Sequence, residues 1–265
     1  MKRTALAAVM LLSPHAARAA RVLVVLSEPM RPSTGEALEG LRSEWSVAID
    51  TVSDERPLPQ GAHGVIIAFG GRAASRASEA EGPLVVALAP AYREEGRRTT
   101  VTVAMTPAPE AFVALLASAG VHRLLAVRAA PADSDFRRRA ASAGKPAGVV
   151  IDDRILSDPG DLPEVLRGPG LAADGVWLAP DPGAVTAESF DAARQYSLAR
   201  AIPFFAPADG LVSGEIRGEL TVSFRDCGRE AARAARELLA GRAVAKVVYP
   251  SAPGKVGVSR SSVPR

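Results

Sequence analysis

The chain has 265 residues, of which 48% are hydrophobic, so it is long enough for one large domain or two small ones with packed cores. Lys2, Arg3 and Arg18 account for the entire formal charge of +3, because removing them from the 32 basic side chains leaves 29, equal to the 29 acidic ones. A chain that is neutral beyond its first segment gives no electrostatic argument for binding nucleic acid or a membrane surface.

Residues 1–19 have the features of a secretory signal peptide. Lys2-Arg3 precedes an apolar run from Ala5 to Leu12, and Ala17-Arg18-Ala19 supplies small residues where a signal peptidase reads. The apolar run is too short to cross a bilayer, which needs about 20 residues. We therefore expect an exported, periplasmic protein cleaved near Ala19, with an uncleaved N-terminal anchor as the alternative.

Strands and helices alternate along the rest of the first half. Continuous apolar runs are typical of strands buried on both faces of a parallel sheet. Strands are predicted at residues 21–26, 45–51, 64–69, 83–90 and 99–105. Helices are predicted after Ser33 or Thr34, either of which can act as the N-cap, and over residues 109–119.

The same alternation restarts at residue 123. Strands are predicted at 123–127, 148–151, around Val176, around Ile202 and at 219–224, and helices at 134–144, 158–167, 186–200 and 226–240. Gly144 is expected to end one of these helices, and Asp226 to cap the last. Two such runs predict an α/β chain with two lobes, each a parallel sheet covered on both faces, and a ligand cleft between them.

Polar residues at strand ends are the candidate ligand contacts, because ligands bind at the carboxyl ends of the strands in open parallel sheets. Asp181 and Asp209 each follow a strand of the second run. A buried carboxylate is costly unless it meets a cation, so these two acids predict a ligand with an amino group. Each is equally well explained as a loop or helix cap. Ser27 and Thr106 end strands of the first run and are further candidates.

Gly70 and Gly71 lie between a strand and the helix that follows it. Exposed N–H groups and the positive end of the helix dipole at such a position suit a carboxylate, although a simple tight turn explains the glycines equally well. Arg72 is expected to pair with a ligand anion or with Glu79 or Glu81. The segment lacks the features of a P-loop and of a dinucleotide fingerprint, so no cofactor is expected. With the two acids, it predicts an amino-acid-like small-molecule ligand.

The residues needed for catalysis or metal binding do not come together in the sequence. His63 and His122 stand apart, with no cysteine or acid at metal-ligand spacing. Cys227 has the spacing of a buried structural thiol, and Trp177 that of a core residue. Arg137-Arg138-Arg139 is interpreted as a solvated helix face, with a phosphate site as the alternative. We therefore expect no enzyme activity, no catalytic residues and no metal.

Four segments match a recognisable pattern: Asp174–Pro182 with Ser189-Phe190, Ile202–Phe205 with Leu211-Val212 and Gly214, Gly228–Ala232 with Leu238–Gly241, and Pro83–Val86. They resemble the ABC-transporter substrate-binding proteins of the TrpX-like family. The resemblance implies a type I periplasmic-binding fold, in which two Rossmann-like lobes joined by three crossovers close on a ligand. It implies a first lobe of residues 20–107 plus 225–247 and a second of 108–224 plus 248–265. The implied function is delivery of a small molecule to an ABC permease.

Two segments depart from the family pattern. Residues 51–64 are too few for the helix usual there, so the first lobe is trimmed, and residues 257–261 lack the asparagine that usually ends the last strand. These departures leave an alternative function, in which a module with a degenerate ligand site acts through protein partners as a sensor or accessory.

Overall fold

The computed structural model describes residues 22–27, 30–45, 49–90, 92–93, 99–130, 132–168, 172–206, 218–219 and 222–250. The predicted signal peptide, Asp209 and the segment from 251 onward lie outside these ranges. Among the described residues, no helix is long and apolar enough to cross a membrane.

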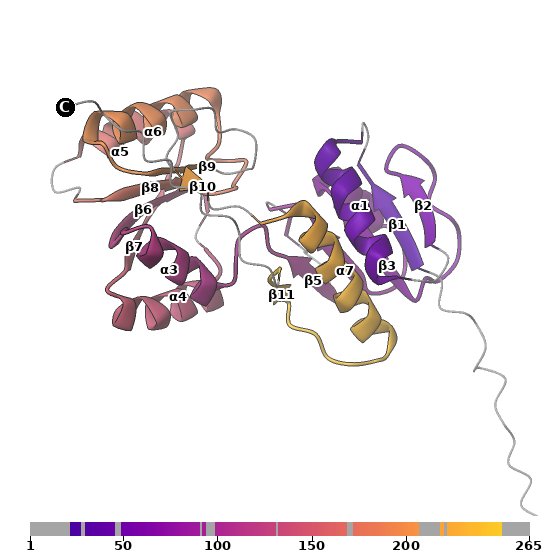
Figure 1. Cartoon of the computed structure of the whole chain (residues 1–265). Helices are drawn as coiled ribbons and strands as arrows, with labels where there is room; N and C mark the ends of the chain where they lie inside the picture. Colours follow the sequence, from indigo (N-terminus) through magenta and orange to yellow (C-terminus); the bar gives the residue numbers. More distant parts are fainter. Residues whose placement is uncertain are drawn as a thin grey trace, which may run out of the picture.

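Two parallel β-sheets organise the chain (Figure 1). The first has the strand order β11-β5-β4-β3-β1-β2 and the second the order β10-β9-β8-β6-β7. All described strand pairs are parallel. This confirms the predicted α/β class, and we call each sheet with its helices the first and the second lobe.

The first lobe is built from strands that are mostly buried on both faces. Its strands are β1 (Val22–Leu26), β2 (Ile49–Ser53), β3 (Val65–Phe69), β4 (Leu84–Ala87), β5 (Thr100–Val103) and β11 (Val247–Val248). Its helices are α1 (Pro32–Glu44), α2 (Gly71–Ala77) and α7 (Phe224–Leu239). Alternate residues of β1, β3 and β4 contact α1 and α7 on one face and α2 on the other, which explains their continuous apolar sequences.

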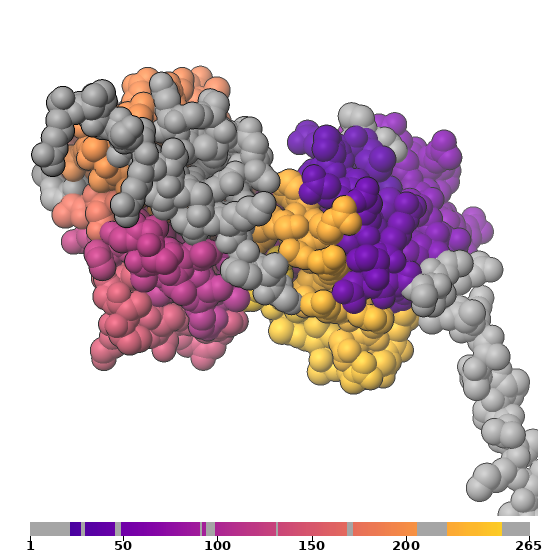
Figure 2. All heavy atoms as spheres, in the orientation of Figure 1, coloured from indigo at the N-terminus to yellow at the C-terminus, as the bar shows by residue number. Residues whose placement is uncertain are grey.

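Helix α7 comes from the last part of the described chain and packs against α1, near its beginning (Figures 1 and 2). The two helices touch backbone to backbone. A Cβ on Gly228 would lie 1.8 Å from the carbonyl oxygen of Ala37, and one on Gly40 would lie 1.9 Å from that of Arg225. Only glycine permits this approach at both positions.

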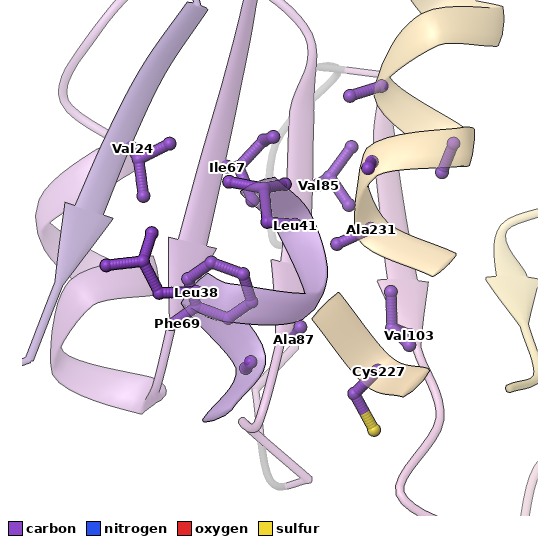
Figure 3. Packing of buried hydrophobic residues seen from close by; sticks show 14 of the residues in the cluster. Val24, Leu38, Leu41, Ile67, Phe69, Val85, Ala87, Val103, Cys227 and Ala231 are labelled. Atoms are coloured by element: carbon purple, nitrogen blue, oxygen red, sulfur yellow. The ribbon is translucent and has the colours of Figure 1, made fainter. Parts of the chain in front are cut away.

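Cys227 lies in the core between α7 and the first sheet, together with Leu41, Phe69 and Val103 (Figure 3). Burial raises the pKa of its thiol to about 12, with a smaller contribution from the nearby Asp226 carboxylate. The prediction of a buried structural thiol is therefore confirmed.

The second lobe has two helices on each face of its sheet (Figure 1). Its strands are β6 (Arg123–Arg128), β7 (Val150–Ile155), β8 (Gly175–Leu178), β9 (Phe204–Ala206) and β10 (Gly218–Glu219). Its helices are α3 (Pro109–Ser118), α4 (Ser134–Ala147), α5 (Leu162–Arg167), which follows a 3-10 turn at Pro159–Asp161, and α6 (Ala187–Arg200). Trp177 is fully buried beneath α3, with its ring 4.7 Å from that of Phe112, so its assignment to the core is confirmed.

Two helix starts differ from the prediction. α1 begins at Pro32, and neither Ser33 nor Thr34 caps it, because proline at the first position has a preset φ and no N–H to satisfy. α7 is capped by Ser223, whose hydroxyl accepts a hydrogen bond from the Asp226 N–H at 3.3 Å. Asp226 therefore lies in the first turn, where its negative charge interacts favourably with the positive end of the helix dipole.

Two element ends also differ. α4 continues past Gly144 to Ala147 and ends where Gly148 adopts the left-handed conformation, with φ at 65°. The strand predicted at 219–224 is wrong at its end, because Phe224 already belongs to α7. The observed strand, β10 at Gly218–Glu219, overlaps the predicted one at Glu219 and pairs with β9.

Candidate functional site

A cavity of about 880 Å³ lies where the chain passes between the two lobes. The first lobe and the segment after it contribute β5 with the residues that follow it, and also Pro90, Tyr92, Arg93, Val244, Lys246, Val247 and Tyr249. The second lobe contributes the ends of β6 and β8 and the beginning of α4. Sites for small molecules have volumes of about 300–1,000 Å³ and occur preferentially between domains, so this cavity is the candidate ligand site.

The first-lobe wall is an edge of the first sheet. Val101 and Val103 are buried in the core beneath α7, and Thr100 and Thr102 project from the opposite face; all four residues line the cavity. The β11 segment joins this wall through a 2.8 Å hydrogen bond from the Thr102 N–H to the Lys246 carbonyl. The wall thus presents hydroxyl groups and one ammonium group.

Arg128, the last residue of β6, belongs to the second-lobe wall. Its side chain is only 10% exposed, and its Nε donates a 2.8 Å hydrogen bond to Oδ1 of Asp153. The guanidinium carbon lies 4.7 Å from the ring centre of Trp177 and 5.8 Å from that of Phe136. Nη2 is buried and has no hydrogen-bond partner in the described part of the chain.

Asp181, which follows strand β8, also lines the cavity. Its Oδ2 accepts hydrogen bonds from the N–H groups of Ala129 and Ala130, at 2.9 and 3.0 Å, and its Oδ1 accepts one from Gly183 at 3.0 Å. The carboxylate therefore joins the loop after β6 to the loop after β8. Thr106 is the other predicted residue that the structure places in the wall.

Ser27, Gly70 and Gly71 lie together elsewhere, at the carboxyl ends of β1 and β3, and are not among the described residues that line the cavity. The Ser27 hydroxyl accepts a 3.1 Å hydrogen bond from the N–H of Ala73 in the first turn of α2. Gly70 has a φ of 102°, and a Cβ there would lie 2.6 Å from Ser27 Oγ. A serine hydroxyl thus satisfies an N–H at the helix start where the sequence predicts a ligand carboxylate.

Arg72 follows these glycines and pairs with two acids that the sequence analysis did not consider. Its guanidinium lies 3.3 Å from the carboxylates of both Asp54 and Glu55, whereas Glu79 pairs with Arg76. Asp209 lies outside the described residues. The predicted site residues are therefore divided: Thr106 and Asp181 share the cavity, and Ser27, Gly70, Gly71 and Arg72 form a separate group.

Sequence reasoning missed Arg128. It is the first charged residue after the apolar run of residues 124–127, which ends at the carboxyl end of β6, an interior strand of the second sheet. The rule that singled out Ser27 and Asp181 also applies to it. Its contacts with Asp153 and Trp177, in contrast, join residues that are far apart in the sequence, so no local pattern predicts them.

Tyr249, which directly follows β11, packs against helix α4 of the second lobe. Its ring centre lies 6.3 Å from that of Phe136 and 5.3 Å from the guanidinium carbon of Arg139. Arg139 is held in turn by Glu110, through hydrogen bonds of 2.8 and 2.7 Å. Burial and the Asp133 carboxylate raise the pKa of the Tyr249 hydroxyl to about 12. A connection between the lobes is therefore anchored beside the cavity.

Two residues of the arginine run of α4 lie on an exposed helix face, as predicted: Arg137 is exposed, and Arg138 is 77% exposed and pairs with Asp135. Arg139 is instead half-buried against Tyr249. Within the described ranges, no three His, Cys, Asp or Glu side chains are grouped closely enough to hold a metal ion.

No protein-family model matches the sequence, and a search of curated proteins finds no match. Solved structures do match. An ABC domain from Streptococcus pneumonia in complex with L-Trp has a TM-score of 0.54 at 14% identity, over 89% of this chain and 90% of that one. A glucose-galactose binding protein from Geobacillus stearothermophilus has a TM-score of 0.51 at 14% identity, over 93% and 99%. A transcriptional activator of the comK gene from Bacillus halodurans has a TM-score of 0.52 at 13% identity, over 92% of each chain.

The chain has the type I periplasmic-binding-protein fold. At these identities the similarity shows the fold alone, and the fold is shared by binding proteins and transcriptional regulators. Function therefore has to be argued from the cavity.

Proposed function

We propose that this protein captures a small molecule in the cavity between its lobes and delivers it to an ABC permease. The observation that carries the proposal is the cavity itself: about 880 Å³, with walls from both lobes beside the crossing segments. A solute that contacts both walls binds the closed arrangement more tightly than the open one and so shifts the protein toward closure.

Two further parts of the proposal come from the sequence. The segments Asp174–Pro182 and Gly228–Gly241 support a binding protein of the TrpX-like type, and Lys2–Ala19 supports export to the periplasm. We also propose lobe boundaries of 20–107 plus 225–247 and 108–224 plus 248–265, with the last boundary falling inside β11, since Val248 still pairs with Val103 of the first sheet.

Thermal melting of the chain from Ala20 to Arg265 tests solute capture, using a panel of amino acids, sugars, purines and organic acids. A solute at 100 times its dissociation constant stabilises by about 2.7 kcal/mol, which raises the melting midpoint by roughly 5–10 °C. Small-angle scattering with that solute should show a more compact particle. Mass analysis of the exported protein should give a chain that begins near Ala20.

A matched pair of variants shows whether the cavity binds the solute. Thr102→Trp fills the first-lobe wall and should abolish the melting shift. Thr51→Trp places the same side chain at an exposed position of β2 and should leave the shift unchanged. Equal shifts in both variants would exclude the cavity. A panel without any hit would favour the alternative, a ligand-degenerate accessory module that acts through protein partners.

A further inference from the structure

The charged groups of the cavity wall differ in how well they are already satisfied. The two described acids are both held by backbone N–H groups. Asp133 caps α4, accepting hydrogen bonds from the N–H groups of Asp135 and Phe136 at 2.8 and 3.3 Å. Asp181 accepts three such bonds from two loops. Asp133 is exposed, and the half-buried Asp181 already accepts three hydrogen bonds, so neither acid requires a ligand cation.

Among the described residues, no cation of the wall pairs with an acid of the cavity lining. The exposed Arg93 donates to the carbonyl oxygens of Pro90 and Tyr92, at 3.2 and 3.0 Å, and the exposed Lys246 has no ion pair in the described part of the chain. Arg128 uses Nε for Asp153, while its buried Nη2 has no partner among the described residues. The cavity therefore has basic groups on both lobes. Both acids among the described lining residues already accept hydrogen bonds from backbone N–H groups.

We propose that the captured solute is a small organic carboxylate, with its anionic group bound by Arg128 of the second lobe and attracted by Lys246 of the first. This proposal rests on the proposed function and names its substrate class. A guanidinium presents N–H groups in a plane that matches a carboxylate, and a buried donor without a partner gains most from such a bond. Met105, Val244 and Val247 supply apolar surface for the body of the solute.

This assignment places the carboxylate at the opposite lobe from the Gly70-Gly71 helix start, where the sequence predicts it. It also removes the reason for a ligand ammonium group at Asp181, because that carboxylate is occupied. The solute class thus changes from an amino-acid-like zwitterion to an organic acid.

Trp177 provides a direct readout, because the Arg128 guanidinium lies over its ring. The chain has two tryptophans, and Trp45→Phe leaves Trp177 as the only one. In this background, a carboxylate that draws Arg128 toward the cavity should change the fluorescence of Trp177 in a saturable way.

The test titrates the Trp45→Phe protein, from Ala20 to Arg265, with matched acids and amides: benzoate and benzamide, succinate and succinamide, together with glucose and L-leucine as uncharged and zwitterionic probes. At least one acid should bind, and its amide should bind at least tenfold more weakly. Arg128→Gln should weaken the acid at least tenfold, and Lys246→Gln should weaken it severalfold and flatten its salt dependence. Arg138→Ala, on the exposed face of α4, is the control and should change nothing.

Each other outcome is decisive. Equal binding of an acid and its amide, or binding of glucose or L-leucine alone, would overturn the carboxylate proposal and leave solute capture standing. If the affinity for the acid is the same in Arg128→Gln and Lys246→Gln as in the parent protein, the proposed carboxylate site would be overturned. Arg128→Lys, which keeps the charge, together with circular dichroism of each variant, separates lost binding from lost folding. A complete absence of binding, also in thermal melts against the wider panel, would overturn the proposed function.

Discussion

The backbone contact between α1 and α7 makes a sharp prediction for Gly228→Ala. The new Cβ would lie 1.8 Å from the Ala37 carbonyl oxygen and 2.6 Å from its carbon, whereas ordinary contacts begin near 3.4 Å. The obstacle is the backbone of a helix, so it cannot rotate away as a side chain does. α7 must therefore retreat from α1 by roughly 1.6 Å at this point.

The cost follows from the core that these helices share. Leu38, Leu41, Ala231 and Ala235 pack there against the first sheet. A gap of only about 0.5–1 Å already removes a quarter to a half of the dispersion energy across a contact, and overpacking of this kind typically costs about 1–3 kcal/mol. Alanine regains about 0.5–1 kcal/mol of helix propensity. We expect a net loss of about 1–2 kcal/mol, or a melting midpoint lower by roughly 2–8 °C.

Gly35→Ala in α1 is the control, because a Cβ there meets nothing within 4 Å. This variant should gain the higher helix propensity of alanine without a steric clash, and so stabilise the protein by about 0.5–1 kcal/mol. Urea unfolding followed by circular dichroism compares the two variants at a common slope. If Gly228→Ala were stabilised as much as Gly35→Ala, the two helices would not be in backbone contact and the reasoning would be refuted.

Three further predictions concern individual side chains. Asp181→Asn should lower the free energy of unfolding by about 1–2 kcal/mol in urea melts, because a carboxylate that accepts three N–H bonds becomes an amide, while affinity for the captured solute should change by less than threefold. Cys227 should resist iodoacetamide at pH 8 until the protein unfolds. Its thiol has a pKa of about 12 in the folded protein, above the ordinary value of 9.0, so rising pH between these values favours the unfolded chain, in which the thiol ionises. Cys227→Ala removes this group and should therefore unfold at a higher pH in an alkaline titration. The Arg139 hydrogen bonds lower the pKa of Glu110, so Glu110→Gln should cost at most about 1 kcal/mol at pH 7 in urea, and this difference should disappear as the pH falls through the lowered pKa.

The core strands were predictable because burial on both faces gives β1, β3 and β4 a continuous apolar sequence. The two-residue strands β10 and β11 were not, since so short a segment has no period and its pairing depends on a neighbour elsewhere in the chain. The start of α7 was misplaced by three residues because Asp226 and Ser223 are both good caps, and sequence alone does not decide between them.

The site was predictable only in part. The position of Asp181 at a strand end followed from the α/β pattern, but its role depends on N–H groups of Ala129 and Ala130, more than 50 residues away. The unsatisfied nitrogen of Arg128 likewise depends on Asp153 and Trp177, which come from two other strands. Hydrogen-bond satisfaction is a property of the folded neighbourhood, so no local spacing reveals it.

The position of α7 also decides the order in which the chain can fold. The second-lobe elements from α3 to β9 are continuous in sequence, whereas the first lobe needs α7 and β11, which are synthesised after all of these. Until α7 arrives, the apolar faces of α1, β3 and β4 have no cover. The first lobe therefore completes its core late, although most of its strands are synthesised first.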